Sequence, residues 1–235
     1  MMRVIVFDIS GSYGHFRKPY APMSPVTFPF PPPPTVLGIV GAILGHGKEE
    51  YHEKLGWETV RIGVALKNPT HIFRAAINLL NTKTGTDKFF RPQGENTHTQ
   101  VPYEFLKMPA FRFYVGQLPE KEADQLSHML REKKTVYTPT LGLSQCLGDV
   151  RFVGDTKATE VANQHQTNCV VAVTDGVRVE YQPRRRYQRV RVPTIMDGGR
   201  VVCRYQEVVA AEDAGPISVH GAKMFEAAGE TITFL

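Results

Sequence analysis

The stretch FDISGSYGHFRK, residues 7–18, joins an apolar run to a loop of unusual composition. Residues 4–9, VIVFDI, are mostly apolar and β-branched, which is typical of a central strand buried on both faces. Glycine explains the turn that follows, but it does not explain the aromatic and basic residues behind it. These residues are Tyr13, His15, Phe16, Arg17 and Lys18. The stretch therefore predicts a core strand that ends in a loop with a function.

The pattern downstream of this loop alternates strands with two helices. A proline-rich connector at residues 19–34 leads into a helix at 35–44, in which Gly38 and Gly41 allow close packing on a sheet. An amphipathic helix is predicted at 120–134, with an acidic start and a basic end. The expected strands are residues 4–9, 60–66, 73–80, 103–116 and 150–153. Segments 60–66 and 73–80 could pair as a hairpin.

This order approximates a ferredoxin-like layout, which makes the fold class α+β. After residue 155 the pattern changes to short strands separated by turns, with Asp175-Gly176 and Asp197-Gly198 expected as hairpin turns. We therefore predict a ferredoxin-like domain at residues 1–155 and a small antiparallel β domain at 156–235. The polar segment 81–102 is expected to protrude from the first domain.

Composition limits the function classes. The chain has 235 residues, 42% of them hydrophobic and 22% charged, as in a soluble globular protein. A net charge of +5 permits an anionic partner. Three cysteines without C-x-x-C spacing support neither a disulfide framework nor a zinc site, and the longest apolar run is too short to span a bilayer. We expect a cytoplasmic protein with no membrane association, no metal and no cofactor.

The first loop has the chemistry of a nucleic-acid contact. Gly11 and Gly14 would let backbone N–H groups approach phosphate, Arg17 adds charge, and the rings of Tyr13 and Phe16 could stack on bases. The alternative is an ordinary structural turn at the end of a strand.

The polar segment after residue 80 contains a second cluster of aromatic and basic residues. Its members are Lys83, Lys88, Phe89, Phe90 and Arg91. We expect at least one of the two phenylalanine rings to lie at an interface, because adjacent residues cannot both face one core. His98, or the pair Tyr51 and His52, could act in metal-free acid–base chemistry on RNA. A solvated histidine is the competing interpretation of His98.

A basic ribbon follows in the last third of the chain. It consists of Arg184, Arg185, Arg186, Arg189 and Arg191. Alternation in YQRVRVP places Arg189 and Arg191 on one face of a strand, where they could follow a nucleic-acid backbone or contact an acidic neighbouring subunit. A solvated strand face is the alternative.

Four segments in series resemble the Cas-five family of CRISPR-associated proteins. They are FDISGSYGHFRKPY (7–20), TFPFPPPPTVLGIVGAILG (27–45), NTHTQVPYEFLKMPAFRFYV (96–115) and YTPTLGLSQCLGDVRFVG (137–154). Family members cap the 5′ end of the guide RNA in type I Cascade complexes, and the chain looks most similar to the type I-B branch. The C-terminal third matches family patterns poorly, and FRFYVG at 111–116 is only a partial RNP1 motif.

The resemblance implies a non-catalytic subunit that binds the 5′ handle of the crRNA. It implies an RRM-like form of the ferredoxin-like fold with a thumb at residues 81–102. It also implies a backbone subunit and a large subunit as neighbours, and target DNA as an indirect partner. The alternative is a metal-independent endoribonuclease that processes repeat RNA, as in the type I-C branch. That branch uses a tyrosine with a Lys-His pair; Tyr51 might align, but no Lys-His dipeptide occurs in the thumb. RNA contacts would include Ser10, Gly11, Tyr13, Gly14, His15, Phe16, Arg17, Lys18, Gln100, Tyr137 and Ser144.

Overall fold

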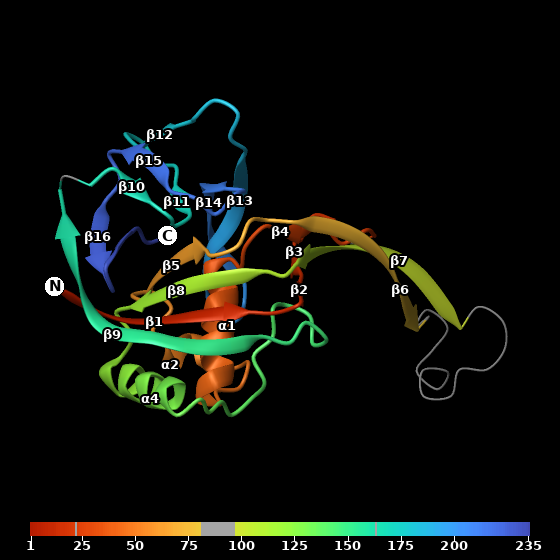
Figure 1. Ribbon diagram of the computed structural model, residues 1–235. Helices are drawn as coiled ribbons and strands as arrows, with labels where there is room; N and C mark the ends of the chain where they lie inside the picture. The colour runs from red at the N-terminus through yellow and green to blue at the C-terminus, as the bar shows by residue number, and fades with distance from the viewer. Residues whose placement is uncertain (22, 81–96, 163) are drawn as a thin grey trace.

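The computed structural model describes residues 1–21, 23–80, 97–162 and 164–235. The fold is α+β and dominated by strands (Figure 1). Its centre is a six-stranded sheet in the order β17-β16-β9-β1-β8-β5, in which every neighbouring pair is antiparallel. The strands are β1 (Met2–Ser10), β5 (Arg61–Leu66), β8 (Ala110–Gly116), β9 (Asp149–Val161), β16 (Met224–Ala227) and β17 (Glu230–Ile232).

Two helices cover one face of this sheet. Helix α1 (Pro33–Leu44) connects β1 to β5, and α4 (Glu120–Arg131) connects β8 to β9. Strand β1 explains why the sheet has two buried faces: Ile5, Phe7 and Ile9 point into the core shared with the helices, whereas Val4 and Val6 point to the other side. The predicted central strand is thus buried on both faces.

The start and end of α1 follow from its sequence. Prolines occupy the first helical turn, where their missing N–H groups would have no partner anyway. The helix ends at Gly45, which has φ +83° and donates its N–H to Gly41. Gly41 does not pack against the sheet as expected: a Cβ there would lie 2.9 Å from Tyr51 in the short helix α2 (Tyr51–Lys54).

A smaller sheet leaves the body at the far end of β1. It consists of β2 (Tyr13–Gly14), β7 (His98–Lys107) and β6 (Ile72–Leu80), in the order β2-β7-β6. The β6–β7 hairpin projects away from the molecule (Figure 1). Beside its base, β3 (Phe16–Arg17) pairs with β4 (Thr27–Phe28).

The expected hairpin of residues 60–66 and 73–80 is wrong. Strand β5 pairs with β8, and β6 pairs with β7. The burial patterns give the reason: five of the six residues of β5 are buried, as in a central sheet, whereas burial in β6 alternates and then ends, as in a ribbon that extends into solvent. Of the predicted thumb, 98–102 belong to β7, and 81–96 lie outside the described residues.

The last third of the chain adds two three-stranded sheets. One has the order β10-β15-β12 and the other β11-β14-β13. The turn predicted at residues 197–199 does join β13 to β14, but the turn at 175–176 joins β11 and β12, which lie in different sheets, and forms no hairpin. The strands are β10 (Gln166–Thr167), β11 (Val171–Ala172), β12 (Arg178–Glu180), β13 (Tyr187–Met196), β14 (Val202–Ala211) and β15 (Ile217–His220).

The two parts of the chain share a sheet and a core. The boundary predicted between residues 155 and 156 falls inside β9, and β16 pairs with that same strand. Val192 and Val208 from the β13–β14 hairpin belong to the core cluster that contains α1. No helix in the described part of the chain is long and apolar enough to cross a membrane.

Candidate nucleic-acid interface

The backbone of the first loop is already hydrogen-bonded within the chain. The Gly11 N–H donates to the Pro109 carbonyl (3.1 Å), and the His15 N–H donates to the Leu141 carbonyl (2.9 Å). A Cβ at Gly11 would lie 2.5 Å from the carbonyl oxygen of Leu147. The expectation that Gly11 brings its N–H to phosphate is therefore wrong. The glycine is needed because another loop of the same chain packs on it.

That second loop, residues 139–148, interlocks with the first. Gly142 has φ +99°, and a Cβ there would overlap the carbonyl oxygen of His15. Gly14 is buried against Leu141, again without room for a ligand. Ser144 is exposed on this loop, and Tyr137 is exposed just before it, where its N–H donates to Ala42 (2.9 Å).

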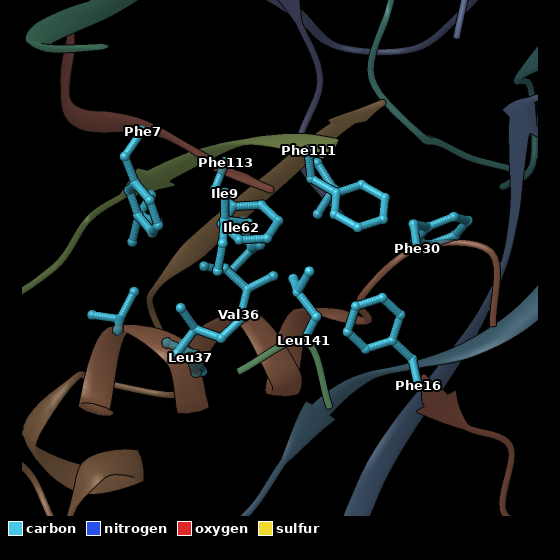
Figure 2. Close-up of a cluster of buried hydrophobic side chains, with 14 of the residues drawn as sticks. Phe7, Ile9, Phe16, Phe30, Val36, Leu37, Ile62, Phe111, Phe113 and Leu141 are labelled. Atoms are coloured by element: carbon cyan, nitrogen blue, oxygen red, sulfur yellow. The ribbon is translucent and has the colours of Figure 1, made fainter. Parts of the chain in front are cut away.

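Two predicted contact residues belong to the interior. Phe16 lies in the main core beside Phe111 and Leu141, and its ring points toward the α1 side of the sheet (Figure 2). His15 is also buried, and burial is the main reason that its pKa is lowered. Neither ring can stack on a base, so both expectations are wrong. Pairing of β3 with β4 places Phe16 inward and Arg17 outward.

Tyr13, in contrast, presents an aromatic ring to solvent. Its side chain is 48% exposed, and its ring centroid lies 5.5 Å from that of Phe73 and 6.4 Å from that of Phe105. Tyr103 and His15 continue this cluster, with ring centroids 5.2 Å apart. We call these five rings the aromatic base, because they lie where the β6–β7 hairpin leaves the body.

Cations border the aromatic base. Lys107 is exposed and pairs in register with Tyr13 across β2 and β7. Arg17 is exposed on β3, and the Lys18 ammonium lies 5.6 Å from the ring centre of Phe28. Ser10 is exposed at the end of β1. The surface thus combines one accessible ring with nearby positive charge, which suits an unpaired base and its phosphate.

Glu104 fixes the hairpin to the body. Its carboxylate accepts hydrogen bonds from Arg74 (3.0 Å) and from the Thr27 N–H (3.2 Å). Its backbone carbonyl accepts a hydrogen bond from His15 Nδ1 (2.7 Å), and its N–H donates to Pro25 (3.0 Å). Glu104 and the rings of Phe73, Tyr103 and Phe105 were not predicted from the sequence; the alternation of aromatic residues at 103 and 105 was the available signal.

The outer part of the hairpin carries two predicted residues. His98 and Gln100 are exposed on β7, and His98 Nδ1 lies 2.8 Å from Thr97 Oγ1. The second predicted cluster, consisting of Lys83, Lys88, Phe89, Phe90 and Arg91, lies outside the described residues.

The structure gives no support to Tyr51 and His52 as an acid–base pair. His52 is fully buried, and burial is the main reason that its pKa is lowered, so substrate has no access to it. Tyr51 packs on its ring, with centroids 4.0 Å apart. Within the described residues, no group of three or more His, Cys, Asp or Glu side chains could hold a metal ion.

The face of the central sheet opposite the helices is closed. Tyr114 of the partial RNP1 motif is buried and donates a hydrogen bond to Glu230. Arg112 bridges Asp8 (2.7 Å) and Glu230 (2.7 Å). Residues from β16 and β17 complete this cover. The face that RRM modules use for stacking is therefore filled by this chain's own C-terminal strands.

The basic ribbon divides into structural and accessible arginines. Arg185 binds Asp213 with two hydrogen bonds of 2.7 Å and lies over the ring of Tyr187 (5.4 Å). The Arg185 side chain is therefore held within the chain and is not free to follow a nucleic-acid backbone. Arg189 and Arg191 are exposed on the same side of β13, as the alternation predicted, and Arg189 pairs with Glu207. Arg184 and Arg186 are exposed.

Comparisons with known proteins agree with one another. The family model described as CRISPR-associated protein (Cas_Cas5) matches residues 4–206. No curated protein matches the chain. Among solved structures, a CRISPR protein from Archaeoglobus fulgidus is similar over 99% of this chain and 98% of its own, with 17% identity and a TM-score of 0.59. A chain described as CRISPR RNA-guided surveillance complex is similar over 98% and 91%, with 11% identity and a TM-score of 0.51.

At such low identity, the structural similarity to these two chains shows a shared fold alone. The family match, in contrast, covers most of the chain. It includes β1, the interlocked loops and both strands of the projecting hairpin. The chain belongs to the Cas_Cas5 family of CRISPR-associated proteins.

Proposed function

We propose that this protein is a non-catalytic RNA-binding subunit of a CRISPR effector complex, and that it holds the 5′ handle of the guide RNA. Membership of the family supports a role in CRISPR, and a solved chain with the same fold is described as part of an RNA-guided surveillance complex. Type I, and its I-B branch, is the setting that we propose from the motifs of the sequence.

The observation that carries this proposal is the exposed ring of Tyr13 on the aromatic base. Phe73 and Phe105 support the ring from behind, so it keeps its orientation in the absence of RNA. A base that stacks on Tyr13 would place its phosphates near Arg17 and Lys107. Stacking on a preformed ring avoids the entropy of ordering a mobile side chain, and it tolerates any base.

The architecture supports RNA binding at this end of the molecule. The strand order β9-β1-β8-β5, with helices α1 and α4 in the two crossovers, is the order of a ferredoxin-like unit, which we propose as the evolutionary core of the fold. Because its open face is closed by β16 and β17, the loop end and the hairpin remain for RNA. We propose that neighbouring backbone and large subunits contact the projecting hairpin, and that target DNA is reached only through the complex.

The test is direct binding of a labelled RNA that contains the repeat-derived handle. Tyr13→Ala should weaken binding by about 1–3 kcal/mol, the usual loss for one base stack. The matched control is Tyr20→Ala, which removes another exposed tyrosine from the turn beyond β3. Equal affinity of wild type and Tyr13→Ala would contradict the proposal.

An endoribonuclease is the second candidate, and exposed His98 on the hairpin is the observation that favours it. Its general base would be His98, acting without a metal on a 2′-hydroxyl. Incubation of the purified protein with repeat RNA in EDTA distinguishes the two. We expect intact RNA. Specific cleavage that His98→Ala abolishes would establish the enzyme instead.

A further inference from the structure

The β13–β14 hairpin presents an exposed basic side next to the candidate RNA interface. Val190 and Val192 of β13 pack against the main core, and Arg189 and Arg191 therefore point to the opposite side. The two arginines are two residues apart on one strand, which spaces their Cα atoms by about 6.7 Å. The core side explains the valines, but nothing in the packing requires the arginines.

Their ion pairs distinguish these arginines. Arg185 is held by Asp213, and Arg189 by Glu207. Among the described residues, no carboxylate oxygen lies within 4.0 Å of Arg184, Arg186 or Arg191. Three exposed guanidinium groups on one short segment thus have no acidic partner in the described part of the chain. Such groups are available to an anion without first breaking an ion pair.

An exposed ring accompanies one of these cations. The Arg191 guanidinium lies 5.2 Å from the ring centre of Tyr205, and the Tyr205 side chain is 40% exposed. Tyr205 projects from β14 on the same side as Arg191, because Arg191 pairs with Glu207 and Pro193 with Tyr205. A cation and an accessible ring side by side repeat the combination found at Tyr13.

Hydrogen bonds connect this surface to the base of the β6–β7 hairpin. The Glu212 N–H donates to the Arg186 carbonyl (3.0 Å), and the Thr70 N–H donates to the Glu212 carbonyl (2.7 Å). Thr70 lies two residues before β6 begins. A single residue, Glu212, therefore links Arg186 to the segment that leads into the β6–β7 hairpin.

We propose that Arg184, Arg186, Arg191 and Tyr205, which we call the β13 surface, bind the single-stranded part of the guide RNA that continues past the handle. The inference rests on the proposed function, because the handle must first be held at the aromatic base. Nucleic acid is favoured over an acidic protein segment because the exposed cations are accompanied by an exposed ring, Tyr205, beside Arg191. A nucleic acid uses both features, because its phosphates contact cations and its bases stack on rings, whereas a carboxylate needs only the cations.

The experiment compares two RNAs: the handle alone, and the handle extended by single-stranded spacer nucleotides. Wild type should bind the longer RNA more tightly. Arg186→Gln combined with Arg191→Gln should weaken the longer RNA roughly tenfold, reduce its salt slope by about 1.4, and leave the handle alone within about twofold. Tyr205→Ala should also weaken only the longer RNA. These side chains are exposed, so thermal unfolding should be unchanged.

Arg178→Gln is the control, because it removes the same charge from an exposed arginine in the other three-stranded sheet. A similar loss of affinity for the longer RNA in this control, or equal affinity of wild type for both RNAs, would overturn the proposal that the β13 surface binds RNA. An equal loss on both RNAs would also overturn it. Failure of the proposed function has a different signature, namely unchanged handle affinity in Tyr13→Ala.

Discussion

At the scale of single residues, Gly142 shows how a glycine can serve the packing of two loops against each other. Its φ of +99° and the overlap of any Cβ with the His15 carbonyl mean that Gly142→Ala must move one of the two interlocked loops. We expect a loss of about 3 kcal/mol in the free energy of unfolding, measured by urea titration. Gly154→Ala is the control, since nothing lies within 4 Å of a Cβ there. Equal stability of the two variants would contradict the interlock.

Asp8 makes a pH-dependent contribution to stability. Burial alone would raise the pKa of Asp8, but hydrogen bonds from Arg112 and Arg151 outweigh it, and the pKa is lowered. Because the folded-state pKa lies below the unfolded one, this stabilisation is complete above the unfolded value and is lost as the pH falls through the folded value.

We therefore expect Asp8→Asn to lower the free energy of unfolding by about 3 kcal/mol at pH 7. The difference from wild type should shrink as the pH falls below about 4, because the unfolded chain takes up the proton first and the folded protein takes it up only at a lower pH. Urea titrations from pH 7 to pH 3 test this, with the exposed Asp149→Asn as the control. If the difference in unfolding free energy between wild type and Asp8→Asn stays constant with pH, the charge of Asp8 does not contribute to stability.

Residue chemistry alone could not separate Tyr13 from Phe16. Both are aromatic residues in the same loop, and the sequence predicted both as stacking residues. What distinguishes them is strand pairing: β2 pairs with β7, and β3 with β4, which turns Phe16 into the core and leaves Tyr13 at the surface. Tyr13 pairs with Lys107, far along the chain, and Phe16 pairs with Phe28 across a connecting loop, so no pattern within the stretch itself reveals the direction of either side chain.

At the scale of elements, the β6–β7 hairpin is an arm with a fixed base. Glu104 joins the hairpin to His15 and Thr27, and the rings of the aromatic base pack around this point. Farther out, its residues are exposed and project from the body (Figure 1). The direction of the arm is therefore set by a few contacts at one end.

We expect Glu104→Ala to widen the range of directions that the arm samples without unfolding the body. Spin labels at Gln100→Cys on the arm and Lys121→Cys on α4 report this as a broader distance distribution, once exposed Cys203 is replaced by Ser. Glu104→Gln should have a smaller effect, because its amide oxygen still accepts a hydrogen bond from the Thr27 N–H, which an alanine side chain cannot do. An unchanged distribution in Glu104→Ala would assign the rigidity to the rings alone.

Elements with strong local patterns were predictable, and their partners were not. The sequence indicated α1, α4 and β1 because prolines, amphipathic spacing and a β-branched run identify them locally. It missed that residues 103–116 form two strands, β7 and β8, in different sheets. Met108, with φ +49° between them, is an unusual residue for that conformation and gave no sequence signal.

At the scale of the whole molecule, we expect a single cooperative unit rather than two domains. Strand β9 runs through the predicted boundary, and the β13–β14 hairpin contributes to the core of the helical side. Calorimetry should therefore show one unfolding transition, and a fragment of residues 1–155 should not fold, because it ends inside β9 and lacks the cover over Val4 and Val6. Two separate transitions, or a folded fragment, would contradict this.

The position of β1 has a consequence for synthesis of the chain. Phe7 of this strand pairs with Phe113 on one side and Phe152 on the other. Strand β1 is therefore translated well before either of its partners, so one edge stays unpaired until β8 has emerged and the other until β9 has emerged. During that interval an apolar strand with open hydrogen-bonding edges invites association with other nascent chains. Shielding of β1 until β8 and β9 emerge would therefore favour correct pairing.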